Sequence, residues 1–300
     1  MSADRENDHA RLERLRDWIG RTERHEDEVT PAPAAALAAL LDRDASTPVA
    51  GSAIPPLAHW LYFPAPARQS ELGEDGHRRR GEFLPPVPLP RRMWAGGRLA
   101  FHDPLRIGER IVRESRVADV AVKRGRVGTL VFVTVRHEIA NATGVAVTEE
   151  HDIVYRGDPG PEGPATVATV AATDETFRRR VVPDPVLLFR YSALTANAHR
   201  IHYDHPYATG VEGYPGLVVH GPLVATLLLD LLRREHPECR VSRFSFRAVA
   251  PLFDIAPFEL CGRTEPGTAN VALWARDAEG RLAVEASAER TDSSPTGERT

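Results

Sequence analysis

The sequence has few cysteines, a single lysine and no long apolar run, and each shortage excludes a class of protein. Its 2 cysteines, Cys239 and Cys261, have no CxxC spacing, which excludes a disulfide framework and a cysteine-ligated zinc site and fits a reducing compartment. The longest apolar run, 223–232, is too short to span a bilayer and contains Thr226 and Asp230. Residues 1–18 are charged and lack the apolar core of a signal peptide. We therefore expect a cytoplasmic protein without a membrane partner.

Lys123 is the only lysine, so nearly every positive charge is an arginine. A GC-rich genome accounts for this bias, and the arginine fork also suits carboxylate and phosphate groups, so composition leaves both explanations open. The net charge is −4, and basic residues are spread along the chain and balanced by acids. This pattern gives no reason to expect nucleic acid as a partner.

The first half of the chain combines two short helical patterns with a series of strand patterns. Apolar spacing predicts a helix over 8–19 and a second helix over 31–42, capped by Thr30 and begun by Pro31. We expect a strand at 57–63 and an irregular connection between Gly73 and Gly97, which is rich in proline, glycine and arginine. Alternating segments separated by turn residues between 98 and 156 predict antiparallel strands.

The second half repeats this order, with an apolar helix at 221–234 followed by strand patterns between 243 and 290. The similarity is also local, because RLAFHDPLRIGE (98–109) resembles RFSFRAVAPLFDIAP (243–257). Two copies of one α+β unit, each an apolar helix wrapped by an antiparallel sheet, predict a double hotdog. The expected organisation is an N-terminal unit (1–157), a linker (158–182), a catalytic C-terminal unit (183–290) and a disordered tail (291–300).

The densest polar cluster lies in residues 189–226, FRYSALTANAHRIHYDHPYATGVEGYPGLVVHGPLVAT. His199, His202 and His205 step by three, and Asp204 adds a carboxylate, so a metal site is one interpretation. Pro206 opposes it, because the residue before a proline is pushed out of helical geometry. No HExxH pattern is present either, and we expect no metal.

The alternative is acid–base catalysis by one histidine beside an amide. YSALTANAHRIH and LVVHGPL resemble the active-site segment of the MaoC-like, or R-specific enoyl-CoA hydratase, family. That family carries Asp-x-Asn-Pro-x-His, followed further along by His-Gly at the start of the central helix. Asn197 stands at the aspartate position and His202 at the catalytic histidine position, and His220 and Gly221 form the pair. The resemblance implies that His202 is the base and that the Gly221 N–H holds the thioester oxygen.

Physical chemistry supports these roles independently. Hydration of an enoyl thioester needs a base for water, a proton donor for the α-carbon and a stabilised enolate oxygen. A glycine N–H at a helix start is an unpaired donor at the positive end of the helix dipole. Gly221 lies just before the apolar run, and a neutral histidine such as His202 suits water activation at physiological pH.

The segment also departs from that pattern. Asn197 cannot ionise, so it would position the water or fix the imidazole, and His202 would have to accept and return the proton itself. His199 and Arg200 replace Asn-Pro. The segment NAHRIHYD (197–204) instead resembles the corresponding segment of type 2 hydroxyacyl-thioester dehydratases and of the subgroup of 3-methylfumaryl-CoA (mesaconyl-C4-CoA) or itaconyl-CoA hydratases. The resemblance covers residues 18–290 and implies an acyl-CoA substrate without a separate cofactor.

Six further residues are candidates for substrate binding. Arg200 is either a solvated loop residue or the partner of a free carboxylate on the acyl chain. Arg247 and Arg91/Arg92 are rivals for that role or for binding CoA phosphates. His220 orients the helix start or touches substrate, and Tyr203 packs or lines the pocket wall. The helix at 31–42 has no His-x-His loop before it. We therefore expect the N-terminal unit to form a non-catalytic groove for the acyl chain or pantetheine.

We expect a hydratase/dehydratase that reversibly adds water to the C2–C3 double bond of an enoyl-CoA, with mesaconyl-C4-CoA as the most specific candidate. A fatty-acyl or polyketide-type 3-hydroxyacyl dehydratase is the first alternative, and a long apolar tunnel without a buried arginine would favour it. A non-catalytic acyl-thioester-binding hotdog protein is the second, since Asn197 replaces the aspartate. Hotdog sheets often pair, so a homodimer is the default expectation.

Overall fold

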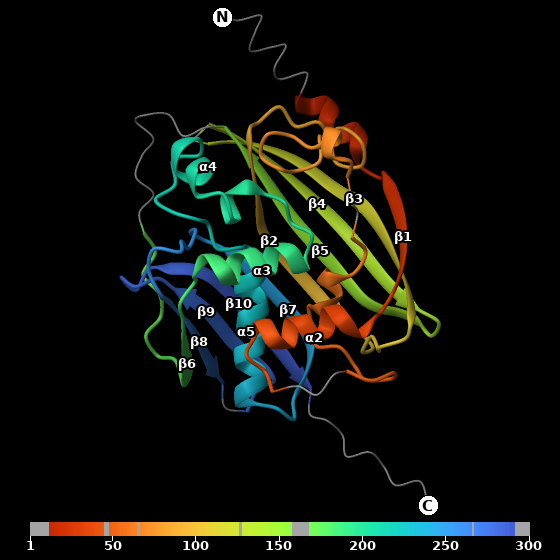
Figure 1. The fold of residues 1–300 in the computed structure, drawn as a ribbon, viewed down its shortest axis with the longest axis vertical. Coiled ribbons are helices and arrows are strands. Elements are labelled where there is room, and N and C mark those ends of the chain that lie inside the picture. The colour runs from red at the N-terminus through yellow and green to blue at the C-terminus, as the bar shows by residue number, and fades with distance from the viewer. Residues whose placement is uncertain are drawn as a thin grey trace, which may run out of the picture.

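A single antiparallel sheet of 10 strands forms the frame of the molecule (Figure 1). The computed structural model describes residues 12–44, 48–64, 67–125, 128–157, 168–265 and 267–291. The strand order is β1-β3-β4-β5-β2-β7-β10-β9-β8-β6. The strands are β1 (Thr22–Glu28), β2 (Arg91–Phe101), β3 (Arg110–Gly125), β4 (Gly128–Asn141), β5 (Gly144–Arg156), β6 (Phe177–Val181), β7 (Arg240–Ala248), β8 (Phe258–Thr264), β9 (Asn270–Arg276) and β10 (Leu282–Thr291).

The sheet consists of two similar halves joined at its centre. Each half has an edge strand (β1 or β6), a central strand (β2 or β7) and three strands between them in the same order. β2 and β7 pair directly, with Leu99 opposite Phe244. The internal repeat expected from the RLAF and RFSF segments is therefore confirmed, and the double hotdog is the observed architecture.

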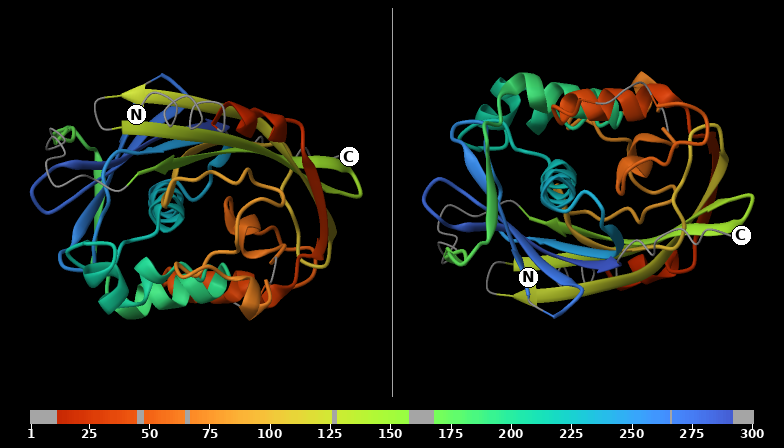
Figure 2. Two further views of the ribbon diagram at one scale, coloured as in Figure 1. Left: turned by 90° about the horizontal axis from the view of Figure 1, so that it is seen from above. Right: turned by 90° about the horizontal axis from the view of Figure 1, so that it is seen from below.

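The second half wraps one apolar helix, α5 (Gly221–Glu235), which lies on the concave face of its strands (Figure 2). Residues 223–232 of α5 are all buried, and the helix packs against β2, β6, β8, β9 and β10. None of the described helices is both long and apolar enough to cross a membrane. The remaining helices are η1 (Arg14–Trp18), α2 (Pro31–Leu40), η2 (Ala58–Leu61), η3 (Gln69–Glu71), α3 (Pro185–Leu194), η4 (Arg200–His202) and α4 (His205–Gly210).

Among its described residues the first half has no long central helix, contrary to expectation. α2 follows edge strand β1 as α3 follows edge strand β6, and α2 and α3 pack side by side (Figure 2). The elements between α2 and β2 are the short helices η2 and η3, whereas the long α5 directly precedes β7. The prediction of a strand at 57–63 is wrong, because Leu57 adopts a left-handed backbone (φ 70°) and the chain continues into the 3-10 helix η2. α2 is mostly alanine and has little side chain with which to fill a concave sheet face.

The predicted bounds of the linker, the first helix and the C-terminal tail can be compared with the observed elements. Part of the expected linker, residues 177–181, is strand β6, which pairs with β8 and so belongs to the second half. The first expected helix is observed as η1, and residues 8–11 lie outside the described residues. The tail expected at 291–300 lies outside them beyond Thr291, as do linker residues 158–167.

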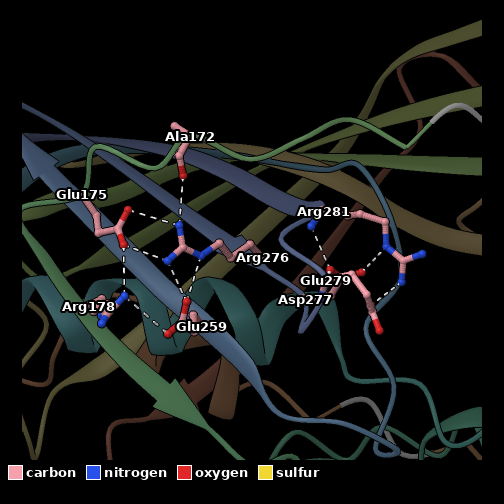
Figure 3. A network of polar contacts seen from close by, with 8 residues as sticks. All are labelled: Ala172, Glu175, Arg178, Glu259, Arg276, Asp277, Glu279 and Arg281. Carbon is pink, nitrogen blue, oxygen red and sulfur yellow. Dashed lines mark hydrogen bonds and ion pairs between the residues drawn. The ribbon is translucent and has the colours of Figure 1, made fainter.

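A buried arginine fastens the segment before β6 to the sheet (Figure 3). Arg276, at the end of β9, donates to Glu259 from both Nε (2.9 Å) and Nη2 (2.7 Å). It also donates to Glu175 (2.7 Å) and to the carbonyl oxygen of Ala172 (3.2 Å). These bonds satisfy the guanidinium within the protein and hold the incoming chain against β8 and β9.

A second buried charge links α5 to both halves. Asp230, in the middle of the apolar run of α5, is 2 % exposed. Its carboxylate accepts hydrogen bonds from Arg43 (2.7 Å), Arg179 (3.0 Å) and Arg234 (2.8 Å). Arg43 follows α2 and Arg179 lies on β6, so one carboxylate joins three segments of the fold.

We predict that Asp230→Asn lowers the free energy of unfolding by about 3 kcal/mol, because breaking a buried ion cluster leaves partly buried arginines without a counter-charge. The measurement is urea unfolding followed by circular dichroism. Glu279→Gln is the matched control, since that glutamate is 64 % exposed and its ion pair among the described residues is with Arg281 at the surface. Equal stability of Asp230→Asn and Glu279→Gln would contradict the structural role of this carboxylate.

Candidate active site

A cavity of about 730 Å³ lies where the two halves meet. The second half contributes Asn197, His202 and Gly221, the three residues expected to be catalytic, so the structure brings them together. The first half contributes Trp60 and Trp94 from η2 and β2. A cavity of this size is large enough for a small-molecule ligand.

The end of α3 fixes the position of Asn197. Asp184 caps the start of that helix by accepting from Leu187 N–H (2.8 Å), and Pro185 occupies the first helical position. After the helix, Ala196 adopts a left-handed backbone (φ 50°), which turns the chain toward the cavity. The side-chain oxygen of Asn197 then accepts from the N–H of His199 (3.0 Å). This Asx turn engages the amide oxygen, and the amide nitrogen is the group that remains for a ligand.

His202 has the geometry of a general base. Its Nδ1 lies 2.7 Å from the carbonyl oxygen of Val218, which can only accept, so Nδ1 carries the proton and Nε2 carries the lone pair. Its ring stacks on His220 at a centroid distance of 3.7 Å. Burial lowers the pKa of His202 to about 4. The imidazole is therefore neutral at physiological pH and able to accept a proton.

His220 and Gly221 form the start of α5, as expected. His220 occupies the N-cap, is 1 % exposed, and hydrogen-bonds through Nε2 to Ser192 Oγ (2.8 Å). It is not among the residues that line the cavity, so its observed contact is with His202 rather than with a ligand. Gly221 is the first residue of the helix and does line the cavity, where its N–H is one of the donors without an intrahelical acceptor.

Of the other residues expected to bind substrate, Arg92 lines the cavity, and four lie outside it: Arg91, Arg200, Tyr203 and Arg247. Arg200 pairs with Asp204 (2.7 Å), and its guanidinium lies over the ring of Tyr207. Arg247 is exposed and pairs with Glu285 across β7 and β10. Tyr203 is exposed and donates to the carbonyl oxygen of Ala198. The arginines that do line the cavity are Arg78, Arg92 and Arg113.

The structure adds a loop from the first half that was expected only as an irregular connection. Residues 73–81 cross to the second half, where the carbonyl oxygen of Asp75 accepts from Arg200 N–H (2.9 Å). Gly76 has φ +88°, and a Cβ on it would lie 1.9 Å from the carbonyl oxygen of Ala198. His77 thereby reaches the cavity wall. An Asp-x-His spacing beside a glycine was the signal in the sequence that could have drawn attention to this loop.

Asp75, His77 and His199 have donor atoms within 4.8 Å of one another. His77 Nδ1 is already hydrogen-bonded to Asp75 Oδ2 (3.0 Å), so the two form a carboxylate–imidazole pair rather than a set of free metal ligands. Burial raises the pKa of Asp75, but the hydrogen bonds from His77 outweigh it and hold that pKa below its usual range. The metal set considered from the sequence does not come together, because His205 is exposed and Asp204 is paired with Arg200.

A second buried polar cluster closes the first-half side of the cavity. Glu149 accepts from Trp60 Nε1 (2.8 Å) and is hydrogen-bonded to His59 Nε2 (2.9 Å) and to His151. Burial raises the pKa of Glu149, but the two histidines hold it well below its ordinary value. His137 lies beside His151 at a ring-centroid distance of 4.6 Å. These residues are far apart in the sequence or alternate on strands, and no local pattern marked them as a group.

Solved structures share this architecture. A MaoC-like dehydratase matches 93 % of this chain and 100 % of its own length with a TM-score of 0.69 at 15 % identity. A Mycobacterium tuberculosis protein described as having a double hotdog fold matches 91 % of this chain and 96 % of its own length, with a TM-score of 0.56 and 15 % identity. At these identities the likeness concerns the fold alone, and it defines the class as double hotdog.

Sequence comparison identifies the family. Residues 57–254 match the family model of hydroxyacyl-thioester dehydratase type 2. Mesaconyl-C4-CoA hydratase of Chloroflexus aurantiacus is 51 % identical over 273 residues, which cover 91 % of this chain and 96 % of that protein. The chain belongs to the hydroxyacyl-thioester dehydratase type 2 family.

We predict that the free energy of unfolding falls as pH is lowered below about 6.5, the ordinary pKa of histidine in an unfolded chain. Burial lowers the folded-state pKa of five histidines: His77, His137, His199, His202 and His220. In that range the unfolded state binds more protons than the folded state, so each ring costs about 1.4 kcal/mol per pH unit until its folded pKa is reached. The lowered pKa values of Asp75 and Glu149 add to the same loss at lower pH.

Urea unfolding between pH ~7 and ~5 measures this dependence. His202→Gln should reduce the slope by about one proton, while His205→Gln, at an exposed position, should leave it unchanged. Stability that stays constant over this range would contradict the neutral burial of the rings.

Proposed function

We propose that this protein reversibly adds water to the C2–C3 double bond of an enoyl-CoA thioester. The single observation that carries the proposal is the position of the His202 Nε2 lone pair in the same cavity as the first N–H of α5 at Gly221. This pairs a neutral base with an oxyanion donor, which are two of the three groups that the reaction needs. The family and the 51 % identical hydratase support the same reaction.

The geometry assigns a role to each group in the hydration direction. His202 Nε2 accepts a proton from water, and the resulting hydroxide adds to C3. The electrons of the double bond move to the thioester oxygen, where the Gly221 N–H and the positive end of the α5 dipole stabilise the enolate. Asn197 positions the water through its amide nitrogen. C2 then gains a proton from an acidic group of the active site.

The walls beside Gly221 favour a short acyl chain. A Cβ on Gly221 would lie 3.9 Å from the carbonyl oxygen of Trp94, so β2 runs close to the helix start. Trp94 packs against Trp60 (5.0 Å between centroids) and Phe246 (5.6 Å), and the Glu149 cluster lies beside them. Bulky rings and buried polar groups therefore line this side of the cavity. This argues against a fatty-acyl substrate.

Arginines in the cavity favour an acyl group with a free carboxylate. Arg92 lies two residues before Trp94 on the same face of β2 and lines the cavity, and its side chain makes no hydrogen bond or ion pair with the described residues. The guanidinium of Arg113 lies over the Phe63 ring and also lines the cavity. We therefore propose a dicarboxylyl thioester such as mesaconyl-C4-CoA, with Arg92 as the partner of its carboxylate.

We predict that His202→Ala lowers kcat/KM for hydration of mesaconyl-C4-CoA by about 1,000-fold, because loss of a positioned base removes general base catalysis. The assay follows loss of the enoyl-thioester absorbance. His205→Ala is the control on the same loop, with an exposed side chain outside the cavity. Activity that survives His202→Ala would place the chemistry elsewhere. Wild-type protein that binds the thioester without turnover would favour the non-catalytic binding protein.

We predict that Arg92→Gln raises KM for mesaconyl-C4-CoA by about 10-fold or more, since a charge-assisted hydrogen bond is worth about 1.5–3 kcal/mol. KM for crotonyl-CoA, which carries the same CoA without the carboxylate, should change less than about 2-fold on the same argument. Arg79→Gln, at an exposed position on the 73–81 loop, serves as the control. An equal rise for both substrates would assign Arg92 to CoA phosphates instead.

A further inference from the structure

The proposed reaction moves two protons, and the expected active-site segment supplies one group that can carry them. Water loses a proton to His202, and C2 must gain one. Asn197 stands where the wider family has an aspartate, and an amide cannot exchange that proton. The Asp75–His77 pair, whose histidine lines the cavity, is a carboxylate–imidazole pair from the other half of the molecule.

Asp75 holds His77 in one orientation. Asp75 Oδ2 lies 3.0 Å from His77 Nδ1, and Oδ1 accepts from the backbone N–H of His77 (3.0 Å). A carboxylate on Nδ1 fixes the tautomer that has its proton there when the ring is neutral. It also stabilises the imidazolium, so Nε2 is the atom that can exchange a proton with a ligand. The His77 side chain lines the cavity.

The loop that carries the pair is fixed against the catalytic segment. Arg200 donates from its backbone N–H to Asp75 O (2.9 Å) and from its side chain to Glu74 O (3.0 Å). Gly76 contacts the backbone of Ala198 so closely that no side chain fits. The Asp75–His77 pair is thus held by backbone contacts to the segment that contains His199 and His202. Its position does not depend on a flexible surface loop.

Three imidazoles form a row from the Asp75–His77 pair to His202. The ring of His77 lies 4.2 Å from that of His199, and His199 lies 5.4 Å from His202. All three line the cavity. The charged groups that act on His77 are Asp75, Arg80 and Arg92, and Asp75 is the only anion among them. Imidazoles at these separations can pass a proton directly or through one water.

We propose that the Asp75–His77 pair is the second acid–base group of the active site and delivers the proton to C2. This inference rests on the proposed hydratase function. In hydration, an O–H bond of water breaks as His202 Nε2 gains the proton, and a C–O bond forms at C3. The proton on His202 passes through His199 to Nε2 of the neutral His77, and Asp75 stabilises the imidazolium that results. The enolate then collapses as a C–H bond forms at C2 and His77 Nε2 loses that proton, so both histidines end neutral and the net change is one water added.

The other buried polar groups of the cavity are less suited to this step. Both oxygens of Glu149 are engaged, by Trp60, His59 and His151. His137 is hydrogen-bonded to Ser115 (2.8 Å) and has no carboxylate partner of its own. His77 combines a carboxylate partner, a cavity-facing side chain and contact with the row that reaches His202.

The test compares His77→Gln, Asp75→Asn and His77→Gly with Arg79→Gln, an exposed change on the same loop. We expect His77→Gln to lower kcat for hydration by about 100-fold with KM within about 3-fold, as for loss of a general acid. Asp75→Asn keeps a hydrogen bond but removes the charge, so we expect a smaller loss of about 10-fold. Added imidazole should restore part of the activity of His77→Gly, a response that a merely structural role would not give.

A complementary readout follows the C2 hydrogen by NMR in D2O. Exchange of the C2–H of the 3-hydroxyacyl thioester should slow in His77→Gln in proportion to kcat. Amide exchange at Arg200, whose N–H bonds Asp75, reports whether the loop remains docked in each variant. Arg79→Gln should match the wild type in every measurement.

Several outcomes would overturn the proposal while the hydratase function stands. Unchanged kcat and C2 exchange in His77→Gln would mean that His202 transfers both protons. Loss of activity together with rapid exchange at Arg200, without imidazole rescue, would assign the loop a structural role. Activity removed by chelation and restored by zinc would assign these side chains to a metal. Wild-type protein that hydrates no enoyl thioester would instead reject the proposed function itself.

Discussion

The pairing of β2 with β7 is the contact on which the rest of this molecule depends. It converts two repeats into one sheet and places the concave face of the first repeat against the catalytic segment of the second. Gly96 lies at this junction, where an added Cβ would lie 2.4 Å from the carbonyl oxygen of Phe246. The close approach brings Trp94, on the same strand, next to the start of α5. The cavity wall therefore follows from a backbone pairing, and side chains only shape it.

The two halves then use the shared space differently. The second half fills its concave face with α5, whose N-terminus serves the site. The first half has the short η2 in the corresponding place, and part of the space that a long helix would occupy is cavity. A short helix in this place thus leaves room for a ligand beside the long helix of the other half. The buried Glu149 and Asp230 are satisfied by histidines, a tryptophan and arginines, so both halves carry charge internally without leaving it unpaired.

Local patterns in the sequence predicted much of this arrangement. Alternation located the long strands, and the apolar run after Gly221 located α5 with its helix-start donor. His202 and Asn197 could be placed because a single segment carries both. Arg200 and Arg247 could not, because the direction of a side chain depends on its partners, here Asp204 and Glu285. The position of the 73–81 loop and the role of η2 could not be predicted from the sequence, because each depends on contacts between distant parts of the chain.

The contact between Gly76 and Ala198 makes sequence change in one repeat depend on the other repeat. After a duplication, a repeat that loses its own catalytic segment is ordinarily free to accumulate changes. Here a loop of the first repeat touches the backbone of the second beside its base, so an insertion or a larger residue in either segment displaces the other. Selection on the reaction therefore acts on both repeats at once, and compensating changes are expected to arise in pairs across the junction.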